Sequence, residues 1–147
     1  MLKKILFTAL FLLTVVLSSV YYLFHRSKPV SEGVVFLNGL ESKVRIVRDE
    51  WGVPHITSDS ERDAYFALGF VMASERLFQM DIQRRLANGQ LSEVLGKRTL
   101  EVDKKFRTLR FRKAMIELME KRKREGKRNK EMWGHLTAFY EGVNEYI

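Results

Sequence analysis

Histidine and carboxylate side chains are the first candidates for chemistry in this chain, which has three histidines and no cysteine. His55 is close in sequence to Asp49 and Asp59, so these groups could form a charge pair or a metal site. The simpler interpretation is a hydrogen-bonded histidine on a strand. His25 is expected at a membrane edge and His135 at the surface or the edge of the core. The lack of cysteine excludes disulfides, thiolate metal sites and a cysteine nucleophile.

Arg76 is the second candidate, because it interrupts a mostly apolar stretch. A buried arginine needs a polar partner, which Glu75 or Gln79 could provide. Two interpretations stay open: an internal ion pair that fixes the position of a helix, or a contact with substrate. The chain has no G-x-S-x-G, P-loop, dinucleotide-binding, H-E-x-x-H or calcium-loop pattern. The residues alone therefore specify no complete catalytic site.

An apolar run, Ile5–Phe24, follows Lys3 and Lys4. As a helix, its 20 residues would span about 30 Å, the thickness of the hydrocarbon core of a membrane. We favour an uncleaved signal anchor, because no A-x-A site is present and the run is long. The alternative is a signal peptide that is cleaved near Ser18 or Ser19. Both predict that the folded part lies outside the cytoplasm, membrane-anchored in the first case and secreted in the second.

The rest of the chain is predicted to be mostly helical with a small β-hairpin, an α+β arrangement. Residues 1–28 form the signal segment, 29–38 a linker with Pro29 and Gly33, and 39–147 one incomplete domain. The hairpin consists of Lys43–Arg48 and Val53–Thr57, joined by a turn at 49–52.

A long helix is predicted from about Glu61 to Leu86. Ser60 and Asp63 have the spacing of a capping box, and Asn88-Gly89 is a stop signal. Gly69 in a helix interior costs about 1 kcal/mol relative to alanine. We therefore expect another element to pack closely against it.

Three further helices are predicted. The first is short, Leu91–Leu95, and the second is capped by Asp103 and reaches about Glu125. The buried side of this second helix is expected to comprise Phe106, Leu109, Ala114, Met115, Leu118 and Met119. Asn129 is expected to cap the last helix. The chain stops at Ile147 on an apolar stripe without a stop signal, which predicts the front part of a longer protein.

The net charge of +8 is concentrated in one stretch. Residues Lys97–Lys130 contain 15 basic and 5 acidic side chains. Such a stretch could bind phosphates or an anionic membrane surface, or it could be a solvated helix face.

Several segments in the same order resemble the amino-terminal part of the penicillin acylase family. They are R-D-E-W-G-V-P-H-I, D-A-Y-F-A-L-G-F-V, R-L-F-Q-M-D-I-Q-R-R-L-A-N-G-Q-L-S-E-V-L-G and Y-E-G-V-N-E-Y-I. The resemblance covers about residues 39–147. One segment departs from it: where the family usually has V-H-A-Q-D-R, this chain has Met72 for the histidine and Glu75 for the aspartate, and it retains Arg76.

The resemblance implies an N-terminal-nucleophile hydrolase with a four-layer αββα sandwich. In this family an exported precursor cuts itself, and the new amino-terminal serine of the large subunit attacks an amide carbonyl with its own α-amino group as base. Family substrates include β-lactam side-chain amides and N-acyl homoserine lactones, and many members bind calcium. This chain resembles only the first part of the small subunit. We therefore assign no catalytic, cofactor-binding or metal-binding residue within it.

The sequence thus predicts the amino-terminal segment of an exported, membrane-tethered amidohydrolase that is inactive by itself. Its partners would be the membrane, through Ile5–Phe24, a large subunit carrying the serine, and a small amide substrate. One alternative is a non-enzymatic membrane-anchored protein whose basic helix binds anionic lipid or, less expected, nucleic acid. Another is a non-functional gene remnant.

Overall fold

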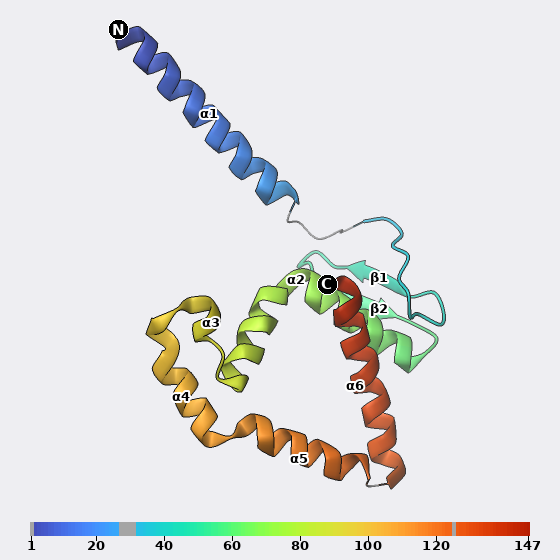
Figure 1. Cartoon of the computed structure of the whole chain (residues 1–147). Helices are drawn as coiled ribbons and strands as arrows, with labels where there is room; N and C mark the ends of the chain where they lie inside the picture. Colours follow the sequence, from blue (N-terminus) through green and yellow to red (C-terminus); the bar gives the residue numbers. More distant parts are fainter. Residues whose placement is uncertain (1, 27–31, 125) are drawn as a thin grey trace. The chain divides into compact units, whose positions relative to one another are not determined.

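The computed structural model describes residues 2–26, 32–124 and 126–147 (Figure 1). The chain divides into two compact units, Met1–Val35 and Phe36–Ile147. The first unit contains helix α1 (Leu2–Arg26), and the second contains all the other described elements. Each unit is considered by itself below.

Helix α1 is apolar along almost its whole length. The stretch Lys3–His25 is 23 residues long, has a mean hydropathy of 2.1, and buries none of its surface within the chain. By length and composition it can cross a membrane, as the run Ile5–Phe24 predicts, and a signal sequence has the same properties.

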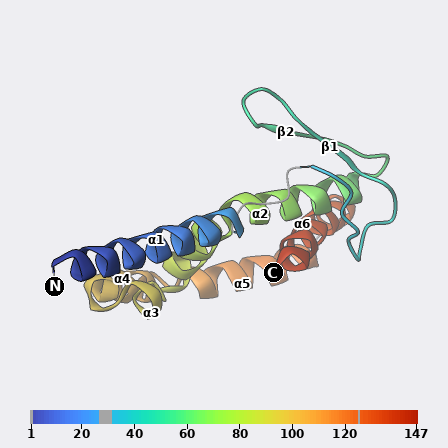
Figure 2. The same ribbon diagram turned by 90° about the horizontal axis from the view of Figure 1, so that it is seen from above.

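The predicted hairpin is present as β1 (Arg45–Arg48) and β2 (Pro54–Thr57), which pair antiparallel with Arg45 opposite Thr57. Asp49 organises the turn, because its Oδ1 accepts hydrogen bonds from the N–H groups of Trp51 at 3.0 Å and Val53 at 2.8 Å. The hairpin lies beside the amino-terminal half of helix α2 (Glu61–Asn88) (Figure 2).

Helix α2 begins and ends close to where the sequence predicts. The Ser60 hydroxyl accepts a hydrogen bond from the Asp63 N–H, and Gly89 closes the other end with a φ of 64°. The N–H groups of Gly89 and Gln90 bond back into the last turn, as in a Schellman motif. One feature was not predicted: Arg76 has non-helical dihedral angles and kinks the helix. The Ser74 hydroxyl donates to the Val71 carbonyl in the preceding turn, a contact that commonly bends helices.

The core lies where α2 crosses the last helix, α6 (Gly126–Tyr146). A Cβ added to Gly69 would lie 2.0 Å from the Phe139 carbonyl oxygen, and one added to Gly142 would lie 1.9 Å from the Phe66 carbonyl oxygen. The two helix backbones are therefore in direct contact, which confirms the close packing predicted at Gly69. The buried apolar side chains around the crossing are Phe66, Ala67, Val71, Ala73 and Ala138.

Between α2 and α6 the chain forms α3 (Ser92–Leu95), a short 3-10 helix (Lys97–Thr99), α4 (Leu100–Leu109) and α5 (Phe111–Lys123). The short helix predicted at Leu91–Leu95 is confirmed. The single helix predicted from Asp103 to about Glu125 is wrong, because Arg110 has a φ of 53° and separates α4 from α5. Glu125 itself lies outside the described residues.

Two further predictions for this region are wrong. Helix α6 begins at Gly126, so Asn129 is not its cap. Several side chains expected in the core are exposed on α4 and α5: Leu109 by 60%, Met115 by 52% and Leu118 by 42%. The described elements therefore leave much of this side of α5 exposed.

The α+β, mostly helical class is confirmed by the six α-helices and the two-stranded sheet of the described residues. The four-layer sandwich stays a prediction.

Candidate functional site

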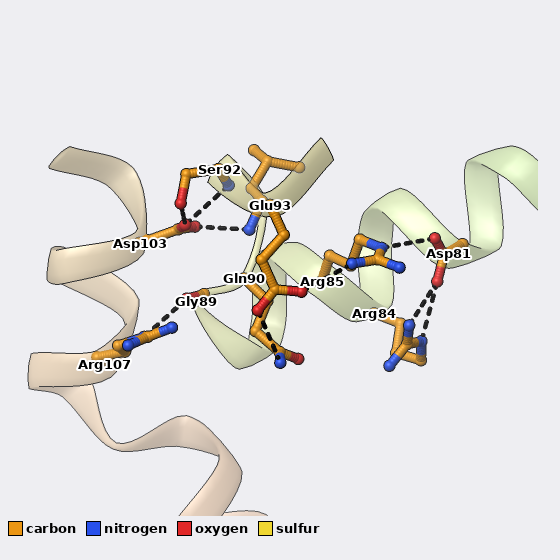
Figure 3. Close-up of polar contacts among 10 residues, drawn as sticks. Asp81, Arg84, Arg85, Gly89, Gln90, Ser92, Glu93, Asp103 and Arg107 are labelled. Atoms are coloured by element: carbon orange, nitrogen blue, oxygen red, sulfur yellow. Dashed lines mark hydrogen bonds and ion pairs between the residues drawn. The ribbon is translucent and has the colours of Figure 1, made fainter. Parts of the chain in front are cut away.

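Asp103 is the centre of the polar cluster that joins the carboxyl-terminal end of α2 to α3 and α4 (Figure 3). Its carboxylate accepts hydrogen bonds from the N–H groups of Leu91 and Ser92, both at 2.8 Å, and from the Ser92 hydroxyl at 2.5 Å. Asp103 is only 2% exposed and lies inside α4. It therefore caps the start of α3 rather than the helix to which it belongs, contrary to the prediction.

Asp63 repeats this arrangement at the start of α2. Its carboxylate accepts from the N–H groups of Glu41 at 3.0 Å and Ser42 at 2.9 Å, and from the Ser42 hydroxyl at 2.9 Å. The capping box is therefore only half present, because the Asp63 carboxylate binds a distant loop. The Ser60 N–H instead donates to the Ser58 hydroxyl at 3.2 Å.

Both aspartates are held in the charged form. Burial opposes ionisation, but the hydrogen bonds from Glu41 and Ser42, with the nearby Arg62 guanidinium, outweigh it and lower the pKa of Asp63. At Asp103, burial is likewise outweighed by the hydrogen bonds from Ser92 and Leu91, so its pKa is also lowered.

These lowered pKa values predict acid sensitivity. As the pH falls, the unfolded chain takes up protons at the ordinary aspartate pKa of about 3.9, before the folded chain does. The stability that the two carboxylates provide is therefore complete above about pH 4 and is lost as the pH falls through the lower folded pKa values. Urea midpoints measured between pH 7 and pH 3 are expected to fall steeply toward the acid end. Asp103→Asn should flatten this dependence, whereas Asp59→Asn, at an exposed position, should leave it unchanged; equal slopes in all three proteins would contradict the prediction.

Arginines complete the cluster in Figure 3. Arg85 bridges Asp81 at 2.7 Å and Glu93 at 3.0 Å, so it connects α2 to α3. Its hydrogen bond to Asp81 raises the pKa of Arg85, and the hydrogen bonds from Arg85 and Arg84 lower the pKa of Asp81. Arg107 on α4 donates from Nε to the Gly89 carbonyl at 2.7 Å. The cluster joins α2, α3 and α4. Its hydroxyl beside a carboxylate, that of Ser92, donates to Asp103 at 2.5 Å, and Asp103 is only 2% exposed.

The predicted candidates lie elsewhere. His55 Nε2 is 3.1 Å from the Asp49 carboxylate, so that pair is confirmed; in the described residues no hydrogen bond or ion pair joins His55 to Asp59. The hydrogen bond with His55 is the main cause that lowers the pKa of Asp49.

The ion pair predicted between Arg76 and Glu75 is present, with 3.9 Å between Nη2 and the Glu75 carboxylate. It is not internal, because the Arg76 side chain is 52% exposed. Glu75 also pairs with Arg48 on β1. A contact of Arg76 with substrate stays a prediction.

His135 lies at the edge of the core, as predicted. It stacks on Tyr65 with a 4.5 Å centroid distance, and its Nε2 is 3.0 Å from the Glu61 carboxylate. Tyr65 and His135 border an open groove of about 400 Å³ between α2 and α6. Its apolar lining is formed by Leu68, Met132, Leu136 and Phe139.

A larger groove of about 860 Å³ lies between the end of α2 and helices α4 and α5. Its charged lining is mostly basic: Arg84, Arg107, Arg110, Arg112, Lys113 and Glu117. Arg110 is the only non-glycine residue with positive φ within residues 2–26, 32–124 and 126–147.

The described residues do not fit a calcium site. Calcium binds six to eight oxygen atoms, and the buried carboxylates of Asp63 and Asp103 already face N–H and O–H donors. Among the residues whose placement is described, no three His, Asp or Glu side chains come together as metal ligands.

Comparisons with known proteins give one coherent result. The family model for penicillin amidase matches residues 43–147. Penicillin acylase 2 proenzyme from Pseudomonas sp. (strain SE83) is 41% identical over 119 residues, which are 81% of this chain and 15% of that protein. Acyl-homoserine lactone acylase QuiP from Pseudomonas fluorescens (strain Pf0-1) is 38% identical over 119 residues, 81% of this chain and 14% of that protein.

A solved structure agrees with these matches. The structure of thermostable penicillin G acylase from Alcaligenes faecalis aligns with a TM-score of 0.59 at 28% identity, and the match covers 71% of this chain and 52% of that one. The matched part is 81% of this chain, but it spans only about 15% of the length of the curated relative.

Proposed function

The chain belongs to the penicillin amidase family, and from this premise we propose that it is the amino-terminal segment of an exported amidohydrolase precursor. The reaction proposed for the complete protein is hydrolysis of a non-peptide amide of a small molecule. The attacking group would be an amino-terminal serine that lies outside these 147 residues. The residues described here would then shape the scaffold and would take no direct part in bond cleavage.

The observation that carries this proposal is the extent of the family match. It covers residues 43–147, nearly all of the unit Phe36–Ile147 that contains the α2–α6 crossing and the Asp103 cluster. Two relatives that match along this stretch are named as acylases. The contacts of the buried polar groups Asp63 and Asp103 fix loops and helix ends, as expected of scaffold residues.

Exposed aromatic side chains support a polypeptide partner, proposed to be the part with the serine. Phe36 is 93% exposed, Trp51 is 83% exposed and Phe78 is 70% exposed, and they lie on three different segments of the folded unit. Single exposed apolar residues also occur on ordinary protein surfaces, so these three side chains are compatible with such a partner and the family match carries the proposal.

Helix α1 supports a location at the membrane. We propose that it holds the chain in the cytoplasmic membrane, with Phe36–Ile147 outside the cytoplasm, on the periplasmic or outer face. If a peptidase removes α1, the same unit would be secreted. In either case the substrate would be met outside the cytoplasm.

The 147-residue chain by itself is expected to hydrolyse no amide. The test is to purify it in mild detergent and to assay chromogenic phenylacetyl and acyl amides, with a complete penicillin acylase as positive control. Turnover that persists after repurification would overturn the proposal that the nucleophile lies elsewhere.

The coding DNA provides an independent test. We expect the sequence after the Ile147 codon to contain an open frame for a large subunit with an internal serine at the cleavage point, in frame or one shift away. Absence of such a frame from the surrounding DNA would overturn the enzyme proposal for this gene and favour a remnant.

A further inference from the structure

We propose that helix α5 lies on the surface of an anionic lipid bilayer, with its apolar stripe at headgroup level and its basic residues against lipid phosphates. The stripe is defined as Phe111, Met115 and Leu118. This inference rests on the proposed placement of the chain at a membrane through α1, and it adds a second membrane contact, made by the folded unit.

The stripe is continuous and exposed. Residues 111, 115 and 118 are separated by four and three positions, so at 3.6 residues per turn they lie on one side of α5. Their exposed fractions are 47%, 52% and 42%. A helix of a soluble domain normally buries such a stripe. Here α4 covers only part of it, where the Phe106 ring lies 5.8 Å from the Phe111 ring, and the rest is exposed.

Basic side chains border the stripe. At about 100° per residue, Arg112 lies on one flank of the stripe, Lys121 on the other, and Arg122 one turn beyond Leu118. All three are exposed. Residues 110–124 contain seven basic and two acidic side chains. Low net hydrophobicity, as in α5, with lysines and arginines beside an apolar face is typical of helices that lie in the membrane interface.

Charge distinguishes this face from the exposed aromatic residues elsewhere in the folded unit. Lysine, here Lys121, is depleted at protein interfaces although arginine is enriched there, whereas an anionic bilayer attracts both along its whole surface. A membrane-spanning α1 would also hold α5 near the bilayer, which raises the effective concentration of lipid around it. A weak surface contact can therefore be populated.

The absence of cysteine makes a direct test possible. Met115→Cys provides a single site for an environment-sensitive fluorophore in the full chain, reconstituted into vesicles. In vesicles with 30% phosphatidylglycerol (about one anionic lipid in three), we expect a blue-shifted label that the neutral quencher acrylamide reaches poorly. In pure phosphatidylcholine vesicles, or with 0.5 M salt (about 4 Å screening length), we expect an aqueous label. A label at Thr137→Cys on α6 serves as the exposed control and should be aqueous throughout.

Charge removal tests the assigned residues. The triple variant Arg112→Gln, Lys121→Gln, Arg122→Gln is expected to weaken docking of α5 about 100-fold, at about fivefold per charge. The matched control removes three exposed charges elsewhere, Lys43→Gln, Arg45→Gln and Arg98→Gln, and should retain the shielded label.

The possible outcomes separate the lipid contact from its alternatives. Equal shielding in anionic and neutral vesicles would show that protein or bare apolar contact covers the stripe, and would overturn the proposal. Carbonate extraction reports on α1 separately. In one outcome the label is shielded in anionic vesicles, but carbonate then removes the chain from the membrane. In that case the docking of α5 stands and the tether through α1 fails. In the other outcome carbonate leaves the chain in the membrane, but the label is exposed to water. That result supports the tether through α1 and overturns the docking of α5.

Discussion

Replacing Gly142 with alanine is expected to lower the free energy of unfolding by about 3 kcal/mol or more. The added Cβ would lie 1.9 Å from the Phe66 carbonyl oxygen, and backbone atoms of α2 cannot move aside as a flexible side chain would. The helices must therefore separate, and separation weakens the packing around the buried Phe66 and Ala138. Urea titration of the full chain in detergent, followed by the fluorescence of Trp133 on α6, measures the change.

Gly134→Ala is the matched control on the same helix. Nothing lies within 4 Å of a Cβ at this position, so alanine should be neutral or should stabilise the protein by about 0.5–1 kcal/mol. Because both variants make the same chemical change in α6, helix propensity cancels in the comparison. Equal stability of the two variants would show that the α2–α6 contact is looser than the structure describes.

Replacing Asp63 with asparagine is expected to lower the free energy of unfolding by about 2–4 kcal/mol. The amide keeps one acceptor oxygen and places a donor group against the N–H of either Glu41 or Ser42, which then lacks a partner. The Arg62 guanidinium, 3.5 Å away, also loses one of its opposite charges, although its pair with Glu141 at 2.7 Å remains. The same urea titration measures the loss, and cleavage by a protease near residues 41–42 should become faster because the loop is released.

Two controls separate the carboxylate from its surroundings. Ser42→Ala removes only the hydroxyl donor, and we expect a loss of about 1 kcal/mol. Asp59→Asn makes the same chemical change at an exposed residue of the preceding turn and should have an effect within about 0.5 kcal/mol. A loss for Asp63→Asn no larger than that for Ser42→Ala would contradict the role given to the charge.

Local signals in the sequence identified most of the elements. Ser60 and Gly89 mark the ends of α2 because capping depends on neighbouring residues, and the hairpin follows from alternation around Gly52. No proline or glycine lies at Arg110, where α4 ends. The apolar periodicity continues across this position and therefore predicts a single helix. The kink at Arg76 has a local indication in Ser74, but many helical serines donate to the preceding turn without a comparable bend.

The polar contacts were harder to predict because their partners are distant in sequence. Asp63 and Asp103 were both interpreted as local caps, yet each binds two successive N–H groups of another segment. A signal was available for Asp63: it precedes Phe66 by three residues and therefore lies on the buried side of α2. The contact of Gly142 with Phe66 could not be derived from α6 alone, because it depends on which helix crosses there.

The crossing of Gly69 and Gly142 also affects when the protein can fold. At about 5–20 residues per second, a ribosome needs roughly 4–15 s to synthesise the chain between these two glycines. During that interval α6 is not yet available to pack against α2. The apolar side of α2 stays uncovered, so the chain remains unfolded or bound to a chaperone. Export through a narrow channel requires an unfolded chain. If the chain is exported as proposed above, the late synthesis of α6 gives α1 time to engage the export machinery before the rest of the protein can close.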